Sequence, residues 1–568
     1  MSRTGTLSIH TENIFPIIKK FLYSNQEVFL RELVSNAVDA TQKLRALAST
    51  GELTGEMGDT RIRIFANAEK NTLTISDRGI GMTEAEVEKY INQIAFSSAE
   101  EFLNKYKDAG AQIIGHFGLG FYSAFMVAER VEIRTRSWQP DAPAVRWSCD
   151  GSTEFELETT DKPERGTDIV LHLAADAKEF LESWRIREIL TKYCRFLPVE
   201  IEFENKVIND QKPIWTQKPT ELNPDDYRSF YDKLFPFSEA PLFWVHLNVD
   251  YPFTLTGVLY FPKLRPDMEL QRNKIHLYAN QVFITDSVED VVPDFLSLLH
   301  GIIDSPDIPL NVSRSYLQTD GNVRKISNHI AKKVADKLQE LFETDRDDFE
   351  KKWGYVGVFL KYGMIRDSSF SERVRKICLV ETIDGDFFTL DEYLARISDR
   401  QTDKNGKRVV LYATDRQAQH TFIEGARKRG YEVLIFDGII DSHFISYIEH
   451  QLEQATVARV DADTIDKLVD KGVERTSALN EEETKQIEAL FKDFIRNPLV
   501  MVQVQVQDET EPPVTVVRPE HQRRIFEMSQ KGMLGDRSLQ EMYNVVLNTN
   551  HPLTKRLLLL PAGSDREL

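Results

Sequence analysis

One short stretch of the chain, residues 31–43, carries four side chains that could do chemistry together: Glu32, Asn36, Asp39 and Lys43. An α-helix turns by roughly 100° per residue, so these four lie within an arc of about 60°. Apolar residues at helical spacing occupy the opposite side, which predicts one amphipathic helix. Such a stripe is usually a solvated face, but asparagine is a mediocre helix former and is unexpected there. The alternative is a polar face that lines a ligand cavity.

A second stretch, "DRGIGM" at residues 77–82, directly follows a predicted strand. Its glycines allow a sharp turn and a close approach of another group to the backbone. The carboxylate of Asp77 is able to accept a hydrogen bond from an amino group such as that of adenine. Most Asp-Gly clusters are simple turns, so this stretch alone leaves both interpretations open.

A third stretch, "GHFGLGF" at residues 115–121, runs into the helical pattern "YSAFMVAE". A glycine-rich loop that leads into a helix offers backbone N–H groups to anions such as phosphate. The loop matches neither the Walker A pattern nor the dinucleotide fingerprint, and a tight packing loop is the alternative.

Together the three stretches predict a nucleotide cavity. Asn36 supplies an oxygen ligand for Mg²⁺, which takes few protein ligands beside phosphates and waters. Glu32 is placed to orient a water molecule, Asp77 to bind the base, and the loop at residues 115–121 to hold the phosphates.

The elements that position these residues alternate between helices and short strands. Helical periodicity covers residues 11–23 and 26–47, and a strand pair joined by a short turn spans residues 61–77. Further strands are predicted within residues 130–138, 167–173 and 198–206. Strands paired through short turns predict a largely antiparallel or mixed sheet with helices on one face, an α/β sandwich. Two short helices with capping-box patterns at residues 83–86 and 98–101 form either a mobile flap or a fixed connection.

The composition is that of a globular protein with several domains. Its 568 residues are 41% hydrophobic and 28% charged, with a net charge of −19, which suggests roughly three or four domains and argues against a general nucleic-acid binder. The three cysteines are far apart, which predicts a reducing cytoplasm rather than a disulfide framework or zinc site. No apolar run predicts an export signal or a membrane span.

Pro-rich and polar composition indicates a linker at residues 208–226. The predicted domains are therefore an N-terminal nucleotide-binding α/β domain at 1–207, a middle α/β domain at 227–452 and a C-terminal α/β domain at 453–568.

Several motifs, in this order, resemble the heat-shock protein 90 chaperones of the bacterial type: "LYSNQEVFLRELVSNAVDATQK", "DRGIGM", "IIGHFGLGFYSAFMVA", "RGTDIVLHL", "YANQVFITD", "GIIDSPDIPLNVSRSYLQ" and "YNVVLNTNHPL". The resemblance spans nearly the whole chain. It implies a multidomain α/β (α+β) protein with an N-terminal GHKL-type (Bergerat) ATP-binding sandwich, a middle domain with the catalytic arginine and client contacts, and a shortened C-terminal dimerisation domain.

The resemblance also implies roles for individual residues. Glu32 positions and activates the attacking water, and Asn36 binds Mg²⁺. Asp77 bonds the adenine amino group with help from Thr167. Arg314 reaches the γ-phosphate from the middle domain, as an arginine finger does, accompanied by Gln318 one turn further on. The remaining cofactor-binding residues are Asp39, Lys43, Gly81, Met82, Gly118, Gly120 and Phe121.

The function implied is that of an ATP-dependent cytoplasmic chaperone that binds non-native proteins and remodels them through closure of its N-terminal domains. It would be a slow Mg²⁺-dependent ATPase that acts without nucleic acid or membrane. Its partners would be client proteins, a second copy of itself and the seventy-kilodalton chaperone system. The alternative within this class is an ATP-binding holdase with little turnover.

Three other classes share such ATP sites: type II topoisomerase subunits, mismatch-repair proteins and sensor histidine kinases. The acidic E-G-D-S motif of a topoisomerase is missing, and a kinase would place a phospho-acceptor helix before the ATP domain.

Two segments depart from the family. "QIAFSSAE" carries Phe96 and Ser98 in the lid segment, and "TKRLLLLPAGSDREL" stands where the family continues with two dimer helices. From the second departure we expect a monomer or a weak dimer.

Overall fold

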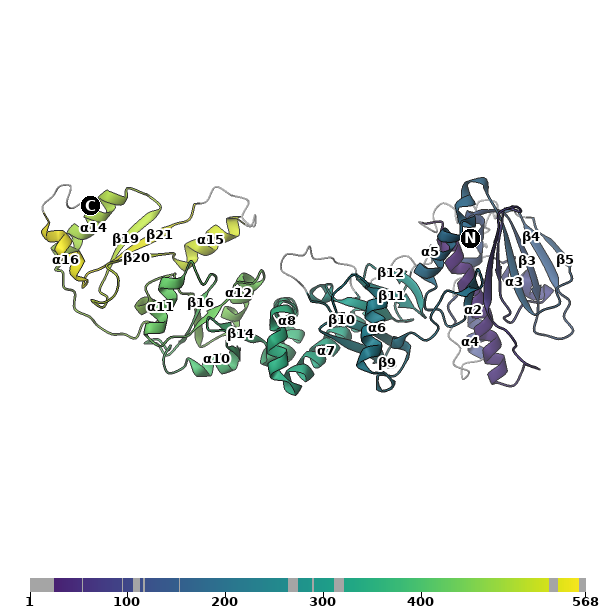
Figure 1. Ribbon diagram of the computed structural model, residues 1–568, viewed down its shortest axis with the longest axis horizontal. Coiled ribbons are helices and arrows are strands. Elements are labelled where there is room, and N and C mark those ends of the chain that lie inside the picture. Colours follow the sequence, from purple (N-terminus) through teal and green to yellow (C-terminus); the bar gives the residue numbers. More distant parts are fainter. Residues whose placement is uncertain are drawn as a thin grey trace, which may run out of the picture. The chain divides into compact units, whose positions relative to one another are not determined.

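The structure is a computed structural model that describes residues 25–53, 55–93, 96–105, 113–115, 118–152, 154–263, 274–288, 291–310, 321–530 and 540–560 (Figure 1). The predicted helix at 11–23 and the predicted site residues Arg314 and Gln318 lie outside these residues. The chain divides into two compact units, Met1–Val334 and Ala335–Leu568. The finer division into domains ending at 207 and 452 stays a prediction.

The first unit contains an eight-stranded mixed sheet in the order β5-β4-β3-β6-β2-β1-β7-β8. Its neighbouring strands are antiparallel except for β1 and β7, which are parallel. This confirms the predicted largely antiparallel sheet. The strands are β1 Ile62–Asn67, β2 Thr72–Ser76, β3 Ala128–Arg136, β4 Val145–Cys149, β5 Glu156–Thr159, β6 Gly166–Leu173, β7 Ile201–Phe203 and β8 Lys206–Val207.

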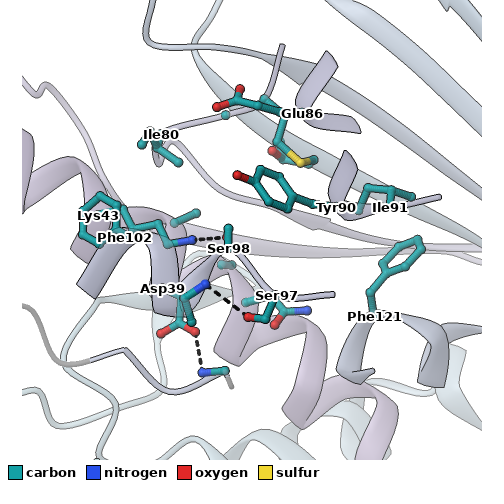
Figure 2. Close-up of a pocket in the computed structure, with 18 of the residues that line it drawn as sticks. Asp39, Lys43, Ile80, Glu86, Tyr90, Ile91, Ser97, Ser98, Phe102 and Phe121 are labelled. Carbon is teal, nitrogen blue, oxygen red and sulfur yellow. Dashed lines mark hydrogen bonds between the residues drawn. The ribbon is translucent and has the colours of Figure 1, made fainter. Parts of the chain in front are cut away.

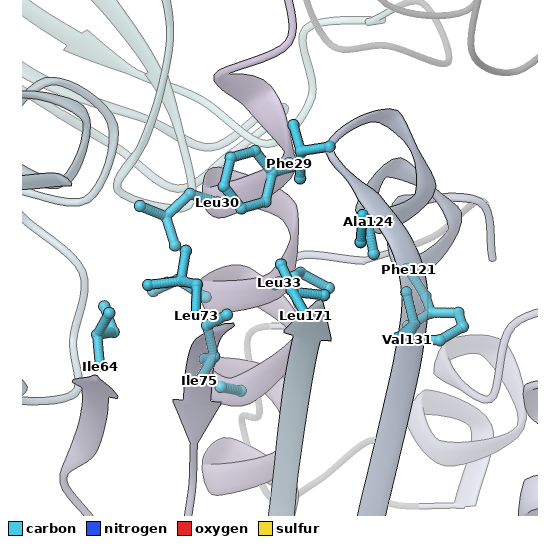
Figure 3. Close-up of a cluster of buried hydrophobic side chains, with 14 of the residues drawn as sticks. Phe29, Leu30, Leu33, Ile64, Leu73, Ile75, Phe121, Ala124, Val131 and Leu171 are labelled. Atoms are coloured by element: carbon cyan, nitrogen blue, oxygen red, sulfur yellow. The ribbon is translucent and has the colours of Figure 1, made fainter. Parts of the chain in front are cut away.

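The predicted amphipathic helix is α2, Val28–Ser49, which packs its apolar side against the sheet (Figure 3). Leu30 and Leu33 on the helix are fully buried, as are Leu73 on β2 and Leu171 on β6. Burial of a continuous apolar stripe against a sheet explains why this segment is helical. The other helices before β7 are α3 Glu84–Tyr90, α4 Ala99–Lys105, α5 Ser183–Tyr193 and the 3₁₀ helices η4 Gly120–Met126 and η5 Ala175–Leu181.

A second sheet of the first unit has five strands in the order β12-β11-β13-β10-β9. An aromatic cluster that includes Trp215, Tyr231 and Tyr260 forms its core. Val282 on β12 is buried within the core of the eight-stranded sheet and α2, so the two sheets share apolar contacts. The elements are η6 Ile214–Thr216, η7 Pro219–Glu221, α6 Pro224–Leu234, β9 Phe243–Val249, β10 Leu255–Phe261, β11 Ile275–Ala279, β12 Val282–Thr285, η8 Asp294–Leu296 and β13 His300–Asp304; α7, Gly321–Thr344, follows.

The second unit contains two further sheets, with strand orders β15-β14-β17-β16-β18 and β19-β21-β20. Its strands are β14 Leu379–Thr382, β15 Phe387–Thr389, β16 Arg408–Ala413, β17 Val433–Ile435, β18 Ala455–Arg459, β19 Val500–Gln505, β20 Val514–Val517 and β21 Tyr543–Asn548. Its helices are α8 Arg346–Arg366, α9 Ser368–Val374, η9 Arg375–Ile377, α10 Leu390–Arg396, α11 His420–Lys428, α12 Asp441–Gln451, α13 Ile465–Leu468, α14 Glu481–Ile495, α15 Glu520–Gln530 and α16 Pro552–Leu559. Among the described helices of either unit, none has the length and apolar character of a membrane span.

Candidate active site

A cavity of about 490 Å³ lies in the first unit, between the polar stripe of α2 and the eight-stranded sheet. This volume is within the range of small-molecule sites, roughly 300–1,000 Å³. The stripe of α2 is therefore not a solvated face. Every described residue predicted for the site lines this one cavity: Glu32, Asn36, Asp39, Lys43, Asp77, Gly81, Met82, Gly118, Gly120, Phe121 and Thr167.

The far end of the α2 stripe holds the surrounding loops in place. Asp39 is buried, and its carboxylate accepts hydrogen bonds from the backbone N–H groups of Ile114 and Gly115, both at 2.7 Å. Lys43 Nζ donates to Ser98 Oγ at 2.6 Å (Figure 2). Burial lowers the pKa of Lys43, against the charges of Asp39 and Glu86, which raise it.

Asp77 forms a buried acceptor where β2 ends, with 5% of its surface exposed. Its Oδ1 accepts a hydrogen bond from Gly79 N–H at 2.7 Å, and its own N–H donates to the carbonyl oxygen of Thr167 at 2.9 Å. Burial raises the pKa of Asp77 to about 7, although the hydrogen bond from Gly79 lowers it. The side chain therefore changes charge near neutral pH in these surroundings.

The loop after Asp77 is tied to strands β3 and β6. Met82 N–H donates to Thr135 Oγ1 at 2.9 Å, and Thr135 Oγ1 lies 3.0 Å from Thr167 Oγ1. Gly81 has a φ of +63°, and a Cβ at this position would lie 1.9 Å from the carbonyl oxygen of Arg136. Only glycine fits there, which gives a structural reason for the "GIG" pattern.

The glycine-rich loop brings its backbone against Glu32. A Cβ on Gly120 would lie 2.7 Å from Glu32 Oε2, so this carboxylate oxygen points toward the start of η4. The helical pattern predicted after the loop is present as the 3₁₀ helix η4, but it ends at Met126, because β3 begins at Ala128. Ser123 Oγ donates to the Gly120 carbonyl at 2.6 Å, which supports this tighter turn.

Helices α3 and α4 and residues 96–98 line one side of the cavity. The capping box at Thr83 and Glu86 is present as predicted. Helix α4 begins after Ser98, as predicted, but Ser98 Oγ binds Lys43 and the Glu101 carboxylate binds Lys89 and Tyr90.

Three residues escaped the sequence reasoning. Tyr90 and Phe102 line the cavity, and no spacing rule distinguishes them from core aromatics. Arg31 is 1% exposed and donates to Glu32 Oε1 through Nε at 2.9 Å and Nη2 at 2.7 Å. A charged residue in the apolar run "VFLREL" was the available signal, because arginine is almost never fully buried unless it is paired.

The arrangement suits a nucleotide with a divalent cation. The buried acceptor Asp77 lies in one part of the cavity, and the glycine loop with the buried carboxylate of Glu32 lies in another. A Cβ on Gly115 would lie 3.7 Å from Asn36 Oδ1, so the amide oxygen faces the glycine-rich segment. A single oxygen ligand of this kind fits Mg²⁺, whose other ligands are commonly phosphates and waters.

The fold and cavity define a class of ATP-binding domain that the comparisons with known proteins support. Residues 23–164 match the family of histidine kinase-, DNA gyrase B- and HSP90-like ATPases, and residues 198–560 match the Hsp90 protein family. The chain belongs to the Hsp90 family and is an Hsp90-type chaperone with an ATP-binding domain. This confirms the resemblance seen in the sequence motifs and sets aside the topoisomerase, mismatch-repair and kinase alternatives.

Individual relatives agree with this assignment. The chaperone protein HtpG of Porphyromonas gingivalis is 52% identical over 581 residues, which cover 98% of this chain and 84% of that protein. HtpG of Bacteroides thetaiotaomicron is 52% identical over 574 residues, with the same coverage of 98% and 84%. HtpG of Pectobacterium atrosepticum is 34% identical over 572 residues, covering 94% of this chain and 89% of that protein. The bacterial type of the family is thereby confirmed.

Proposed function

We propose that this chain is an ATP-driven chaperone that binds non-native proteins and remodels them while it slowly hydrolyses ATP with Mg²⁺. The observation that carries the proposal is the meeting of eleven predicted site residues in one cavity. They come from α2, from the turn after β2, from the glycine loop and from β6. Together they offer an acceptor for the base, backbone N–H groups for the phosphates and an oxygen ligand for Mg²⁺, the three parts that a nucleotide site requires.

In the proposed mechanism, Asp77 and Thr167 bind the adenine amino group, and the backbone around Gly118 and Gly120 receives the phosphates. Asn36 holds Mg²⁺, which would neutralise charge on the phosphate oxygens. Glu32 orients the attacking water through Oε2, the oxygen that points toward the glycine loop. Because Oε1 is bound to Arg31, the orientation of the carboxylate is restricted before ATP arrives.

The proposal extends to residues between β13 and α7. Arg314 would contact the γ-phosphate when the middle domain docks on the ATP domain, and Gln318 would assist it. Positive charge at the equatorial oxygens stabilises the transition state of phosphoryl transfer. Hydrolysis would then depend on a conformational step that involves both domains.

Partners and location complete the proposal. The clients are non-native proteins, the chain is a monomer or associates as a weak homodimer, and it cooperates with the seventy-kilodalton chaperone system in the cytoplasm. All three cysteines are free and buried, which supports a reducing compartment.

The experiment compares the full chain with its Asp77→Asn variant in the reactivation of a heat-denatured enzyme with added ATP. The wild type should raise the recovered activity in an ATP-dependent manner, and Asp77→Asn should not. Suppression of client aggregation by both proteins, with no ATP-dependent recovery from either, would instead indicate a holdase.

A further inference from the structure

The buried arginine beside the proposed catalytic carboxylate needs support from outside its own helix. Arg31 and Glu32 are consecutive residues of α2. Consecutive helical side chains project roughly 100° apart and do not face one another. The two hydrogen bonds from Arg31 to Glu32 Oε1 therefore require the arginine side chain to bend toward its neighbour. A long, flexible side chain keeps one such conformation only when other groups hold it.

The ring of Tyr193, the last residue of α5, is one such group. Arg31 Cζ lies 5.6 Å from the centroid of this ring, within the range of a cation–π interaction, which strengthens when the partners are removed from water. Both side chains meet that condition, since Tyr193 is 6% exposed and Arg31 is 1% exposed. The ring thus limits where the guanidinium lies, and the guanidinium limits where the Glu32 carboxylate lies.

Tyr193 is itself fixed by a charged cluster at the start of α2. Glu27, the residue before the helix, does not use its side chain to cap it. Its carboxylate instead accepts hydrogen bonds from Tyr193 OH and Lys192 Nζ, both at 2.6 Å, and from Arg185 Nη2 at 2.9 Å. Burial acts to raise the pKa of Glu27, but the hydrogen bonds from Lys192 and Tyr193 lower it overall. The charged form that holds the tyrosine hydroxyl is therefore favoured.

Tyr193 also contacts the second sheet of this unit. The ring of Phe283 on β12 lies 5.9 Å from the ring of Tyr193, at an interplanar angle of 63°. This edge-to-face geometry is a favoured one for aromatic pairs. The neighbouring residue Val282 is fully buried in the core that α2 and the eight-stranded sheet share. A single side chain on α5 therefore contacts both the arginine of α2 and the strand β12.

We propose that Tyr193 is a positioning residue for ATP hydrolysis, which holds Arg31, and through Arg31 the Glu32 carboxylate, in an orientation that depends on the contact between α5 and β12. The inference rests on the proposed function, because it takes Glu32 as the group that orients the water. Release of Oε1 lets Oε2 turn away from the glycine loop. Turnover then falls while the base and phosphate contacts that set ATP affinity are unchanged.

The test uses the full chain and measures kcat for ATP hydrolysis, the Kd for ATP and the thermal unfolding midpoint. Tyr193→Leu removes the ring, and we expect kcat to fall at least tenfold with Kd within twofold of wild type. Tyr193→Phe keeps the ring and loses only the hydroxyl, so this variant should retain most of the wild-type activity, with kcat within about threefold of wild type. Phe283→Leu, on the opposite contact of the ring, should lower kcat at least threefold.

A matched control distinguishes positioning from loss of packing. Phe203 is a buried aromatic residue of the same core, with Arg187 Cζ 5.6 Å from its ring centroid, and it lies on β7. Phe203→Leu should lower the unfolding midpoint about as much as Tyr193→Leu and leave kcat within twofold of wild type. In an Arg31→Met background, Tyr193→Leu should change kcat by less than twofold, because its effect passes through the arginine.

The outcomes separate this inference from the proposed function. If Glu32→Ala retains normal turnover, the role of Glu32 is wrong, and the inference is overturned with it. If Glu32→Ala is inactive while Tyr193→Leu and Phe283→Leu both keep kcat within twofold of wild type, the proposed function stands and the positioning role is overturned. Equal loss of kcat on Tyr193→Leu with and without Arg31 would also overturn it. If Tyr193→Leu fails to fold, Phe283→Leu and the double variant Phe283→Leu/Arg31→Met decide between the same outcomes.

Discussion

At the scale of single residues, the surroundings of Asp77 act in opposite directions on the charge of its carboxyl group. Its hydrogen bond from Gly79 favours the charged form, and burial disfavours it. An adenine amino group that donates to the carboxylate would tip this balance toward the charged form. Asp77→Asn removes the charged acceptor, and a buried charge-assisted hydrogen bond contributes about 1.5–3 kcal/mol. We therefore expect ATP affinity to fall at least tenfold, measured by calorimetric titration; an affinity within twofold of wild type would refute the assignment.

The same residue predicts a pH dependence of stability in the absence of nucleotide. Because the pKa of Asp77 is raised to about 7 in the folded chain, above the ordinary value of about 3.9, its contribution to the free energy of unfolding is greatest in acid. That contribution is lost as pH rises from about 4 to about 7. Asp77→Asn lacks this titration, so its thermal unfolding midpoint should rise relative to wild type between pH 5 and pH 8. A constant difference between the two proteins over that interval would contradict the raised pKa.

The sequence allowed prediction of the residues that line the cavity better than of those that hold the lining in place. Glu32, Asn36 and Asp39 were recognisable because their polar types stand out on an amphipathic helix. The charge of Arg31 within "VFLREL" indicates that it needs a partner, but the sequence does not identify the partners. Glu32 and Tyr193 are brought to it by side-chain bending and by a helix more than 150 residues away in the chain. Periodicity contains no information about such contacts.

At the scale of elements, aromatic and charged side chains connect helices α3 and α4. One of these side chains is Phe96, a residue at which the chain departs from the family pattern. The rings of Phe96 and Tyr90 stack with centroids 6.0 Å apart, and Lys89 Nζ lies 5.5 Å from the centroid of Phe96. Lys89 and Tyr90 both bind the Glu101 carboxylate of α4, each at 2.9 Å. These contacts connect the two short helices beside the cavity.

We expect Phe96→Ala to speed nucleotide release. An aromatic pair contributes about 0.5–1.5 kcal/mol beyond its buried area, so the dissociation rate of ADP should rise between about twofold and tenfold. Stopped-flow release of a fluorescent ADP measures this rate, and Phe155→Ala, at an exposed site directly before β5, serves as the control. An unchanged rate would show that the stacked pair does not restrain helices α3 and α4.

Element type was predictable where the hydrophobic pattern was long, as in α2 and in the hairpin of β1 and β2. After the glycine loop the sequence predicted a helix without its type, because the apolar run "FYSAFMVA" fits an α-helix and a 3₁₀ helix equally well. The difference depends on local hydrogen bonds such as that of Ser123 to Gly120. The spacing of apolar residues, one every three or four positions, does not reveal such bonds.

At the scale of the whole molecule, hydrolysis in this account needs more than the ATP domain. Arg314 follows β13 of the second sheet in the chain, and its proposed contact with the γ-phosphate forms only on docking. Arg314→Ala should leave the Kd for ATP within twofold and lower kcat at least about tenfold, as expected for an arginine that acts in the transition state. A fragment of residues 1–207 should likewise bind ATP and hydrolyse it more slowly than the full chain. Equal rates for fragment and full chain would refute the role of a second domain.

The cavity beside α2 is proposed to be a site of ATP hydrolysis, with Glu32 as the carboxylate that orients the water. Steady-state phosphate release by the full chain and by Glu32→Ala, with ATP binding measured on the same preparations, tests it most directly. Water orientation matters only on the path to the transition state, so Glu32→Ala should bind ATP within twofold of wild type and release phosphate at less than about a tenth of the rate (~1.4 kcal/mol). Undiminished phosphate release by the Ala variant, at saturating ATP, would contradict the account.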